Sequence, residues 1–428
     1  MKQKLTLFAL ISLVVLFWSA PAYSASMDDL EKKIDLLTDE LDDLKEGDMI
    51  KGQRGRSRKF QQPNFVTIFG YGELHYIDPD NSHAVLDQHR YVIGIHSILN
   101  KWIHLTAEID FEHAAQQLEF ELSYVDFLLS REFNVRAGVM LAPIGFLNEF
   151  HEPPLFWTTE RPILQQRLIP TTWSMAGAGI LGTPVDGLNY RVYFVGSLQS
   201  IEDNNGSGGS GTGFGGDASS FSSNGIRGGR HQINSAIAED FAVTGRLEFT
   251  KLIPGLQVGI STFLGDTSQG LIDEGGFMAL IEADFQYRKN WFEMNGTIVN
   301  TSISDTEELN AFCTAHSATC GDADGSGGRI AENQFGFNIQ AGVHLPQLMG
   351  WKTTQDIIPH FMFERVRTQD KNDGTYAPDF ANNRDQVYTT GVAYLPIPKV
   401  SIKSDYTHTI LGDSTSTDQF NMSVSYLY

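Results

Sequence analysis

The chain has 428 residues and a formal net charge of −21. This acidic balance argues against nucleic-acid binding, which needs a basic footprint. Beyond the N-terminus no apolar run approaches the ~20 residues that a transmembrane helix needs. The remaining choices for the exported chain are therefore a periplasmic protein or a transmembrane β-barrel, whose alternating strands escape hydropathy scans.

Residues 1–24 are typical of a signal peptide. Two lysines precede an apolar stretch from Leu5 to Trp18, and Ala22-Tyr23-Ser24 fits a signal-peptidase site. The apolar stretch is too short to span a bilayer, so we expect cleavage just before Ala25 or one residue later. An uncleaved N-terminal anchor is the alternative interpretation.

Residues 25–49 are predicted to form a short periplasmic α-helical coiled coil, because apolar residues recur there in steps of three and four. The seam consists of Leu30, Ile34, Leu37, Leu41 and Leu44. One helix of this length cannot bury such a seam alone, so we expect self-association; packing against the mouth of a barrel is the alternative. Residues 50–63 form a basic linker that could contact anionic headgroups or the cell wall.

Residues 64–428 are predicted to be all-β, with runs of alternation separated by turns. Between Ile103 and Glu112, for example, apolar residues alternate with polar and acidic ones. Short turns such as Pro254-Gly255 alternate with long connections such as 304–333, which is the pattern of a transmembrane antiparallel β-barrel. We count about 16 strands, a size that leaves an aqueous channel. The last strand ends on an aromatic residue, Tyr428. In this it resembles the C-terminal strands that barrel-assembly machinery recognises.

The two cysteines, Cys313 and Cys320, lie close together in a polar stretch. An even cysteine count in an exported chain predicts a disulfide within a loop. A metal pair is the alternative, but His316 is the only histidine nearby and the set makes a poor zinc site.

Motifs that carry catalysis or bind cofactors are not found. The histidines are scattered, and no Gly-x-Ser-x-Gly elbow is present. Gly211, Gly213 and Gly216 match a dinucleotide fingerprint but lie in a Gly/Ser-rich loop. The segment from Asp322 resembles a calcium loop but has Asn333 at the twelfth position, where a glutamate is needed. We therefore expect no enzyme activity, no cofactor and no metal site.

Residues 143–172 form a long segment rich in aromatic residues and prolines, and such a loop is not expected to be floppy. Folded into a wide barrel, it would narrow the lumen; a position on the outer surface or at a trimer contact is the alternative. The charges expected at this constriction are Glu149, Glu152, Glu160, Arg161 and Arg167. The charges expected on the opposing pore wall are Glu73, Arg90, Glu108, Asp110, Arg136, Arg191, Arg246 and Lys403. Opposed charges of this kind select ions by sign and size.

The stretch from Tyr124 to Trp173, which contains this loop, is similar to the phosphate-selective porin O and P family of outer-membrane porins. The match rests on Tyr124-Val125-Asp126-Phe127, Val135-Arg136-Ala137-Gly138 and Pro143-Ile144-Gly145-Phe146, with Glu160-Arg161 downstream. The resemblance implies a 16-stranded barrel, a homotrimer and diffusion of small solutes. It also implies an outer membrane of a Gram-negative bacterium, where lipid and lipopolysaccharide surround the barrel and the N-terminal segment lies in the periplasm.

The sequence departs from the family in its inward charges. A phosphate channel needs a dense ladder of arginines and lysines, whereas the inward positions here are mixed and somewhat acidic. Two selectivities stay open: a channel for small anions held by Arg161 and Arg167, and a weakly selective general porin. The competing functions are a tether between outer membrane and cell wall with the barrel as anchor, and a barrel enzyme, for which no nucleophile can be named.

Overall fold

The structure is a computed structural model that describes residues 65–201, 220–230, 233, 236–273, 275–315, 329–374, 376 and 383–428. The barrel forms one compact unit, residues 64–349 and 355–428. The predicted signal peptide, coiled coil and basic linker lie outside the described residues, and so does Cys320. These predictions stay predictions.

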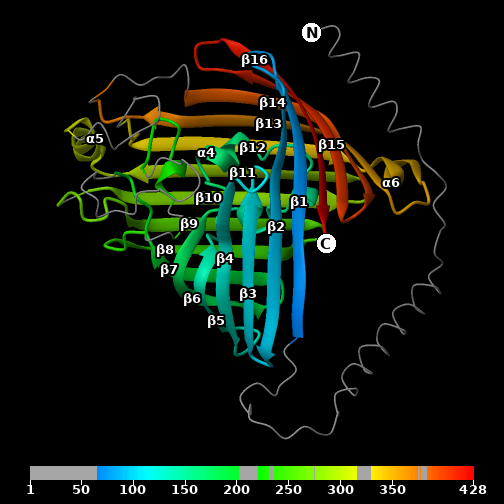
Figure 1. The fold of residues 1–428 in the computed structure, drawn as a ribbon, viewed down its shortest axis with the longest axis horizontal. Coiled ribbons are helices and arrows are strands. Elements are labelled where there is room, and N and C mark those ends of the chain that lie inside the picture. The colour runs from blue at the N-terminus through cyan, green and yellow to red at the C-terminus, as the bar shows by residue number, and fades with distance from the viewer. Residues whose placement is uncertain are drawn as a thin grey trace, which may run out of the picture. The chain divides into compact units, whose positions relative to one another are not determined.

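Within the described residues, sixteen antiparallel strands form a closed barrel in which each strand pairs with its neighbours in sequence. The barrel closes where β1 meets β16, with Tyr71 opposite Leu427 (Figure 1). The prediction of an antiparallel barrel of about 16 strands is confirmed. The strands are β1 (Phe65–Pro79), β2 (Val85–Asn100), β3 (Ile103–Glu112), β4 (Gln117–Leu128), β5 (Asn134–Leu141), β6 (Ser174–Val185), β7 (Leu188–Gly196), β8 (Phe241–Ile253), β9 (Leu256–Asp266), β10 (Phe277–Lys289), β11 (Phe292–Ile303), β12 (Asn333–Val343), β13 (Asp356–Lys371), β14 (Arg384–Ile397), β15 (Val400–Ile410) and β16 (Ser416–Leu427).

Side chains along the strands alternate between an apolar outer face and a polar lumen. On β8, the outward Phe241 and Leu247 are 49% and 47% exposed, whereas the inward Arg246 and Glu248 are 1% and 6% exposed. A protein surrounded by water buries apolar groups and exposes charges. The inverted distribution fits a barrel whose outer face contacts lipid.

The connections at the two ends of the barrel differ in length. At the short-turn end, two residues join β8 to β9, and Gly255 takes the positive φ of 83° that the tight turn requires. At the long-loop end, β5 is joined to β6 by residues 142–173 and β11 to β12 by residues 304–332. The predicted alternation of short turns and long loops is confirmed.

Short helices occur in the connections, and the sequence analysis did not predict them. They are α3 (Phe146–Glu149), η1 (Pro153–Leu155), α4 (Ile163–Arg167), η2 (Arg227–Gly229), α5 (Thr306–Ala315) and α6 (Leu345–Met349). Most are too short to show a helical period, and α5 lies in a stretch that the cysteine spacing had marked as a loop. In the part of the chain that the structure describes, no helix is both long and apolar enough to cross a membrane.

An apolar core fills one side of the lumen. It joins inward residues of the strands, such as Phe263 and Val299, to Leu164 and Trp173 of the β5–β6 connection and to Leu309 of α5. All of these side chains are at most 1% exposed. The long-loop end of the barrel is therefore partly filled by its own connections, and the remaining polar space lies on the other side.

Candidate functional site

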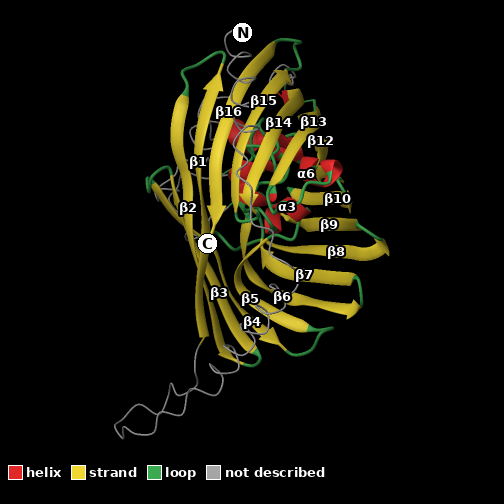
Figure 2. Cartoon of the chain, turned by 90° about the vertical axis from the view of Figure 1, so that its right-hand side faces the viewer, coloured by secondary structure: helices red, strands yellow, loops and turns green. Residues whose placement is uncertain are grey.

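Residues 142–173, here called the inner loop, fold into the barrel and include the segment 143–172 for which the sequence left several positions open. Figure 2 shows its helix α3 enclosed by the strands. The two ends of the inner loop are closed by the Ala142 amide, which donates to the Trp173 carbonyl at 2.8 Å. The buried Asn148 side chain bridges the same two residues. These hydrogen bonds hold the two ends of the inner loop together, while the middle of the loop crosses the lumen.

The middle of the inner loop is attached to β15. The Lys403 ammonium donates to the carbonyl oxygens of Pro153 at 2.6 Å and Thr158 at 2.9 Å. It also lies 3.8 Å from the centre of the Phe156 ring. Two residues along the strand, Asp405 accepts the Thr159 amide at 2.6 Å. The inner loop covers Lys403, so this lysine, which was expected to line the open pore wall, instead holds the loop.

Strand β13 holds the second half of the inner loop. The buried Glu364 carboxylate accepts the amides of Ile163 and Leu164, each at 3.1 Å, at the start of α4. These amides have no partner within the helix, and the helix dipole favours a negative charge there. On β14, Asp385 accepts from the Arg167 guanidinium at 2.7 Å.

Two glycines on β12 make room for the inner loop. A Cβ atom on Gly336 would lie 2.7 Å from the Leu168 side chain, and one on Gly342 would lie 2.7 Å from the Trp157 ring. Trp157 packs there against Ile358. The close approach of loop and wall therefore requires glycine at both positions.

On the opposite side, the inner loop contacts β7. The Glu149 carboxylate of α3 lies 3.0 Å from the Arg191 guanidinium. Burial raises the pKa of Glu149, although the positive charge of Arg191 opposes this shift. A second loop carboxylate, Glu152, has a buried oxygen with no hydrogen-bond partner among the described residues.

An ion cluster centred on Arg90 joins the strands β1 to β4; we call it the Arg90 cluster. The guanidinium lies 3.2 Å from Glu73, 2.9 Å from Glu112, 3.5 Å from Asp110 and 3.4 Å from Glu121. One positive charge thus faces four carboxylates, an arrangement whose excess charge is negative.

The inner loop reaches the Arg90 cluster through His151. Its Nε2 atom lies 2.9 Å from the Tyr71 hydroxyl and 3.4 Å from the Glu121 carboxylate. Tyr71 also donates to Glu121 at 3.1 Å. Glu108 offers a further carboxylate to the same group.

A second ion cluster, centred on Arg246, lies on β7, β8 and β10. Arg246 donates to Asp284 at 2.9 Å and lies 3.6 Å from Glu282. Arg136 on β5 forms a separate bidentate pair with Asp126, at 2.7 and 2.9 Å. Carboxylates thus pair with the wall arginines here as well.

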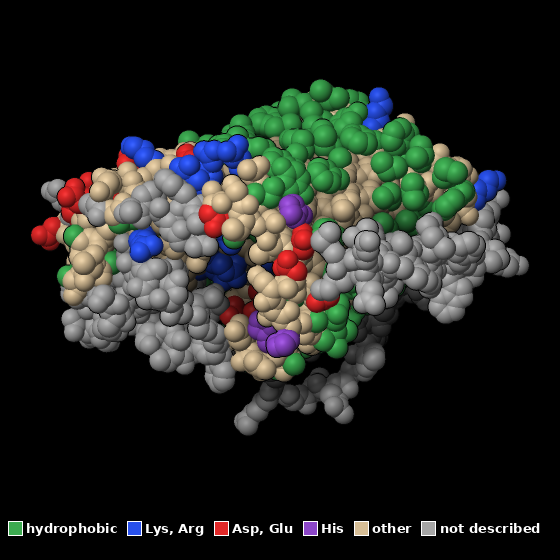
Figure 3. Space-filling model, turned by 90° about the horizontal axis from the view of Figure 1, so that it is seen from above, with side chains coloured by type: hydrophobic (Ala, Val, Ile, Leu, Met, Phe, Trp, Pro, Cys, Tyr) green, Lys and Arg blue, Asp and Glu red, His purple; other side chains and the backbone are tan. Residues whose placement is uncertain are grey.

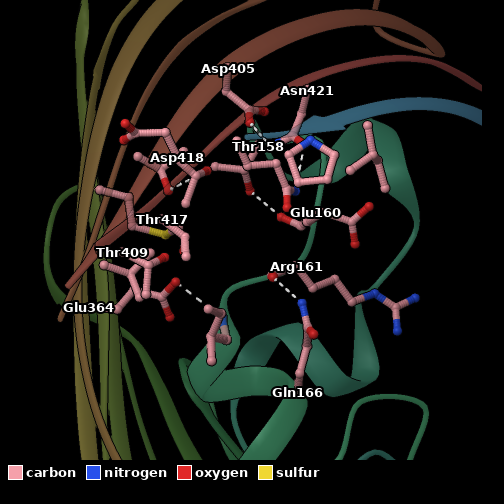
Figure 4. Close-up of a pocket in the computed structure, with 18 of the residues that line it drawn as sticks. Thr158, Glu160, Arg161, Gln166, Glu364, Asp405, Thr409, Thr417, Asp418 and Asn421 are labelled. Carbon is pink, nitrogen blue, oxygen red and sulfur yellow. Dashed lines mark hydrogen bonds between the residues drawn. The ribbon is translucent and has the colours of Figure 1, made fainter. Parts of the chain in front are cut away.

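Between the inner loop and the wall formed by β1 and β13–β16 lies a polar cavity of about 370 Å³. Figure 4 shows Glu160 and Arg161 of the loop at its edge, with Glu364, Asp405 and Asp418 on the wall. The cavity also presents threonine hydroxyls of β14, β15 and β16. Four carboxylates and one guanidinium therefore surround a space of the size of a small solute.

Glu160 and Arg161 differ in their contacts. The Glu160 carboxylate accepts a hydrogen bond of 2.9 Å from His75 on β1. Burial alone would raise the pKa of Glu160, but this bond and the charge of His75 outweigh it and lower the pKa. Arg161 donates to the His151 carbonyl at 3.4 Å and has no carboxylate within ion-pair distance in the described parts of the chain. Burial, then the positive charge of Arg90, lower the pKa of Arg161.

The structure brings the predicted site residues together in two groups. Glu73, Arg90, Glu108 and Asp110 meet in the Arg90 cluster, while Arg191 and Arg246 meet on the opposite wall. The sequence analysis missed Tyr71 and His75, although both share the inward face of β1 with Glu73 at a spacing of two. It also missed Glu364, whose partner in α4 is distant in sequence and left no local signal.

These observations define the structural class of the protein. A closed barrel of sixteen antiparallel strands, with a lipid-compatible outer face and a loop folded into a charged lumen, has the architecture of outer-membrane porins. Figure 3 shows hydrophobic side chains over a broad area of the surface, beside a hollow in which charged side chains are visible.

Comparisons with known proteins agree on the fold. The barrel is similar to a loop-deletion mutant of OmpT, an outer membrane protein of Vibrio cholerae, with a TM-score of 0.52 and 8% identity, covering 86% of this chain and 100% of that one. It is also similar to an anion-selective porin from Comamonas acidovorans, with a TM-score of 0.51 and 11% identity, covering 85% of this chain and 100% of that one. At these identities the likeness shows the fold alone.

The sequence comparisons found one similar protein and identified no family. The chain is 28% identical over 382 residues to an uncharacterized protein of Aquifex aeolicus (strain VF5), covering 87% of this chain and 82% of that protein. No family model matches the chain.

Proposed function

We propose that the protein is a channel in the outer membrane through which small polar solutes diffuse passively. One observation carries the proposal: the inner loop crosses a charged lumen and leaves a cavity of about 370 Å³ between itself and the strand wall. Water-filled barrels of this size need such a narrowing to select solutes by size and charge. The apolar outer face supports a location in a bilayer.

Glu160 and Arg161 form the constriction in this proposal, since both border the cavity. Glu149 and Arg167 are anchors, because each is paired with a wall residue of opposite charge. Glu152 is the remaining carboxylate of the inner loop, and it interacts electrostatically with Glu108 on β3. The pore wall then consists of the Arg90 cluster and the arginines and carboxylates around Arg246.

We propose a preference for cations over anions. The wall arginines are paired with carboxylates. The described residues that line the cavity include four carboxylates and one guanidinium, that of Arg161, and two of the carboxylates, Glu160 and Asp418, also pair with His75 and His408. A negative field of this kind concentrates cations. The resemblance to phosphate-selective porins then concerns descent and barrel architecture, because phosphate transport would need cations whose charge is not compensated. The alternative, a channel selective for small anions, would depend on the positive charge of Arg161.

The test is single-channel conductance of the purified protein in a planar bilayer, with the reversal potential measured under a KCl gradient. We expect discrete conductance steps and a reversal potential whose sign reports K⁺ as the more permeant ion. Arg161→Gln should move the reversal potential further in the same direction, because it removes the only cavity guanidinium. Silence at all voltages would refute the channel, and a reversal potential of opposite sign would refute the cation preference.

The organisation of the full chain belongs to the same proposal. A coiled coil of residues 25–49 would join three barrels into a homotrimer and place a basic linker near the cell wall, which keeps the tethering function as a second candidate. Native mass spectrometry in detergent tests the trimer. Deletion of residues 25–59 should leave conductance intact; a loss of envelope integrity with normal conductance would assign the tethering role to this segment.

A further inference from the structure

Three metal-ligating side chains converge at the long-loop end of the barrel wall, on β2 and on the turn that follows β3. Both imidazoles present Nδ1 to one oxygen: Asp87 Oδ2 lies 3.2 Å from His89 Nδ1 and 2.8 Å from His113 Nδ1. The ligand atoms of all three residues lie within 4.8 Å of one another. None of these three residues lines the cavity or pairs with Arg90, although His89 and His113 are chain neighbours of Arg90 and Glu112.

The backbone holds these three side chains in place. The register of β1 and β2 shifts between Glu73 and Leu74, which leaves His89 as the extra residue of a bulge beside Asp87. Across the sheet, His113 begins a turn in which three consecutive non-glycine residues have positive φ, 49° at His113 itself. The His113 amide donates to the His89 carbonyl at 3.0 Å, and this hydrogen bond holds the turn next to the bulge. Such conformations are uncommon and concentrate at sites that grip a ligand.

The donor set and its spacing fit a transition metal. Tetrahedral Zn²⁺ with ligands at about 2.0–2.1 Å separates its donor atoms by roughly 3.3 Å. The two observed separations from Asp87 are within half an ångström of this value. Two imidazole nitrogens with one carboxylate suit zinc and its neighbours, whereas calcium and magnesium prefer oxygen donors alone. Three protein ligands leave a fourth position for water.

We propose that Asp87, His89 and His113 bind a divalent transition-metal ion, for which Zn²⁺ is the probe. The metal replaces the protons that now link the imidazoles to Asp87, so binding releases protons and weakens at low pH. The side chains are 23%, 25% and 39% exposed, so an ion from outside can reach them. The neighbouring His75 stacks on His89 with ring centres 4.6 Å apart and supports the ring from behind.

A second group of possible ligands, Glu108, Glu121 and His151, is a weaker candidate. Its members lie in the Arg90 cluster, where Arg90 and Tyr71 already occupy the Glu121 carboxylate. A cation there would have to displace a guanidinium.

The test is calorimetric titration of Zn²⁺ into the full chain in detergent micelles, in a buffer that does not bind metals. We expect His113→Ala and Asp87→Asn each to weaken one site per chain at least tenfold, since even outer-sphere changes cost about 10–100-fold. The matched control is His408→Ala. This residue forms a similar pair with Asp418, 2.7 Å apart, but has no third ligand among the described residues, so the variant should bind like the parent.

A measurement on the unaltered protein covers the case in which the variants fail to fold. Saturating Zn²⁺ should protect His113 from diethyl pyrocarbonate while His408 stays reactive, as read by peptide mass spectrometry. Equal affinities in the parent and both site variants, equal weakening in the His408 control, or modification of His113 that Zn²⁺ does not slow would each overturn the proposal.

Discussion

Replacing Lys403 by methionine tests how the inner loop is held in the lumen. The lysine is 1% exposed and donates to two loop carbonyls, Pro153 and Thr158. Methionine keeps the length and apolar stem of the side chain but removes both hydrogen bonds and the contact with the Phe156 ring. The inner loop should therefore leave its docked position more often.

The size of the effect follows from the contacts. A hydrogen bond from a charged donor contributes about 1.5–3 kcal/mol, so the two bonds together contribute roughly 3–6 kcal/mol. Loss of the buried charge also removes its desolvation cost, which places the net change near the lower end of this range. Since about 1.4 kcal/mol changes an equilibrium tenfold, a loss of about 3 kcal/mol raises the undocked fraction about 100-fold.

The assay is single-channel recording in a planar bilayer at fixed voltage. Lys403→Met should produce frequent excursions to a higher conductance, because an undocked inner loop widens the passage. Lys399→Met is the matched control: this lysine lies on the exposed turn between β14 and β15, so the variant removes the same charge without touching the loop. The reasoning is refuted if Lys403→Met records like the parent or if Lys399→Met gains the same excursions.

Three further predictions concern stability, pH and redox state. Arg246→Met leaves the buried carboxylates around it unpaired and should lower the free energy of unfolding by about 3–5 kcal/mol, measured by urea titration with tryptophan fluorescence; an unchanged midpoint contradicts this. The ion pair with His75 holds the pKa of Glu160 below its usual 4.5 despite burial, so the stability it adds is present above about pH 4.5 and is lost as the pH falls through the lowered pKa. Channel noise should therefore rise on acidification below this pH in the parent, and a similar rise in Glu160→Gln would contradict the assignment. Cys313 and Cys320 should resist iodoacetamide until a reductant is added, and alkylation without reductant would show that the predicted disulfide is absent.

The sequence was sufficient to predict what depends on local pattern. Alternation with a period of two identified the strands, and it is the reason why Arg90, Arg246 and Glu73 were expected on the inward face. The same period also contained His75, two residues from Glu73, but histidine was not weighed as a lumen residue. The composition of the inner loop, with its aromatic residues and prolines, indicated an ordered loop, but it did not decide between the lumen, the outer surface and a trimer contact.

The remaining features depend on contacts between residues that are distant in sequence. The position of Lys403 beneath the inner loop could not be predicted. Strand periodicity indicates on which face of a strand a side chain lies, but not which other segment covers that face. The role of Gly336 and Gly342 could not be predicted either, since it depends on where Leu168 and Trp157 lie in the folded barrel. The bulge at His89 likewise appears only when β1 and β2 are paired.

The anchors of the inner loop have a consequence for how the barrel is assembled. The loop is held by His75 near the start of the chain and by Lys403 near its end, at separations of 85 and 250 residues from their loop partners. Contacts so distant in sequence form late during folding. These contacts can form only when the strands that carry His75 and Lys403 both lie beside the inner loop, which requires β1 and β15 to be in place in the barrel wall. Docking of the inner loop therefore connects the first strands of the barrel to its last strands, across the seam where β1 pairs with β16.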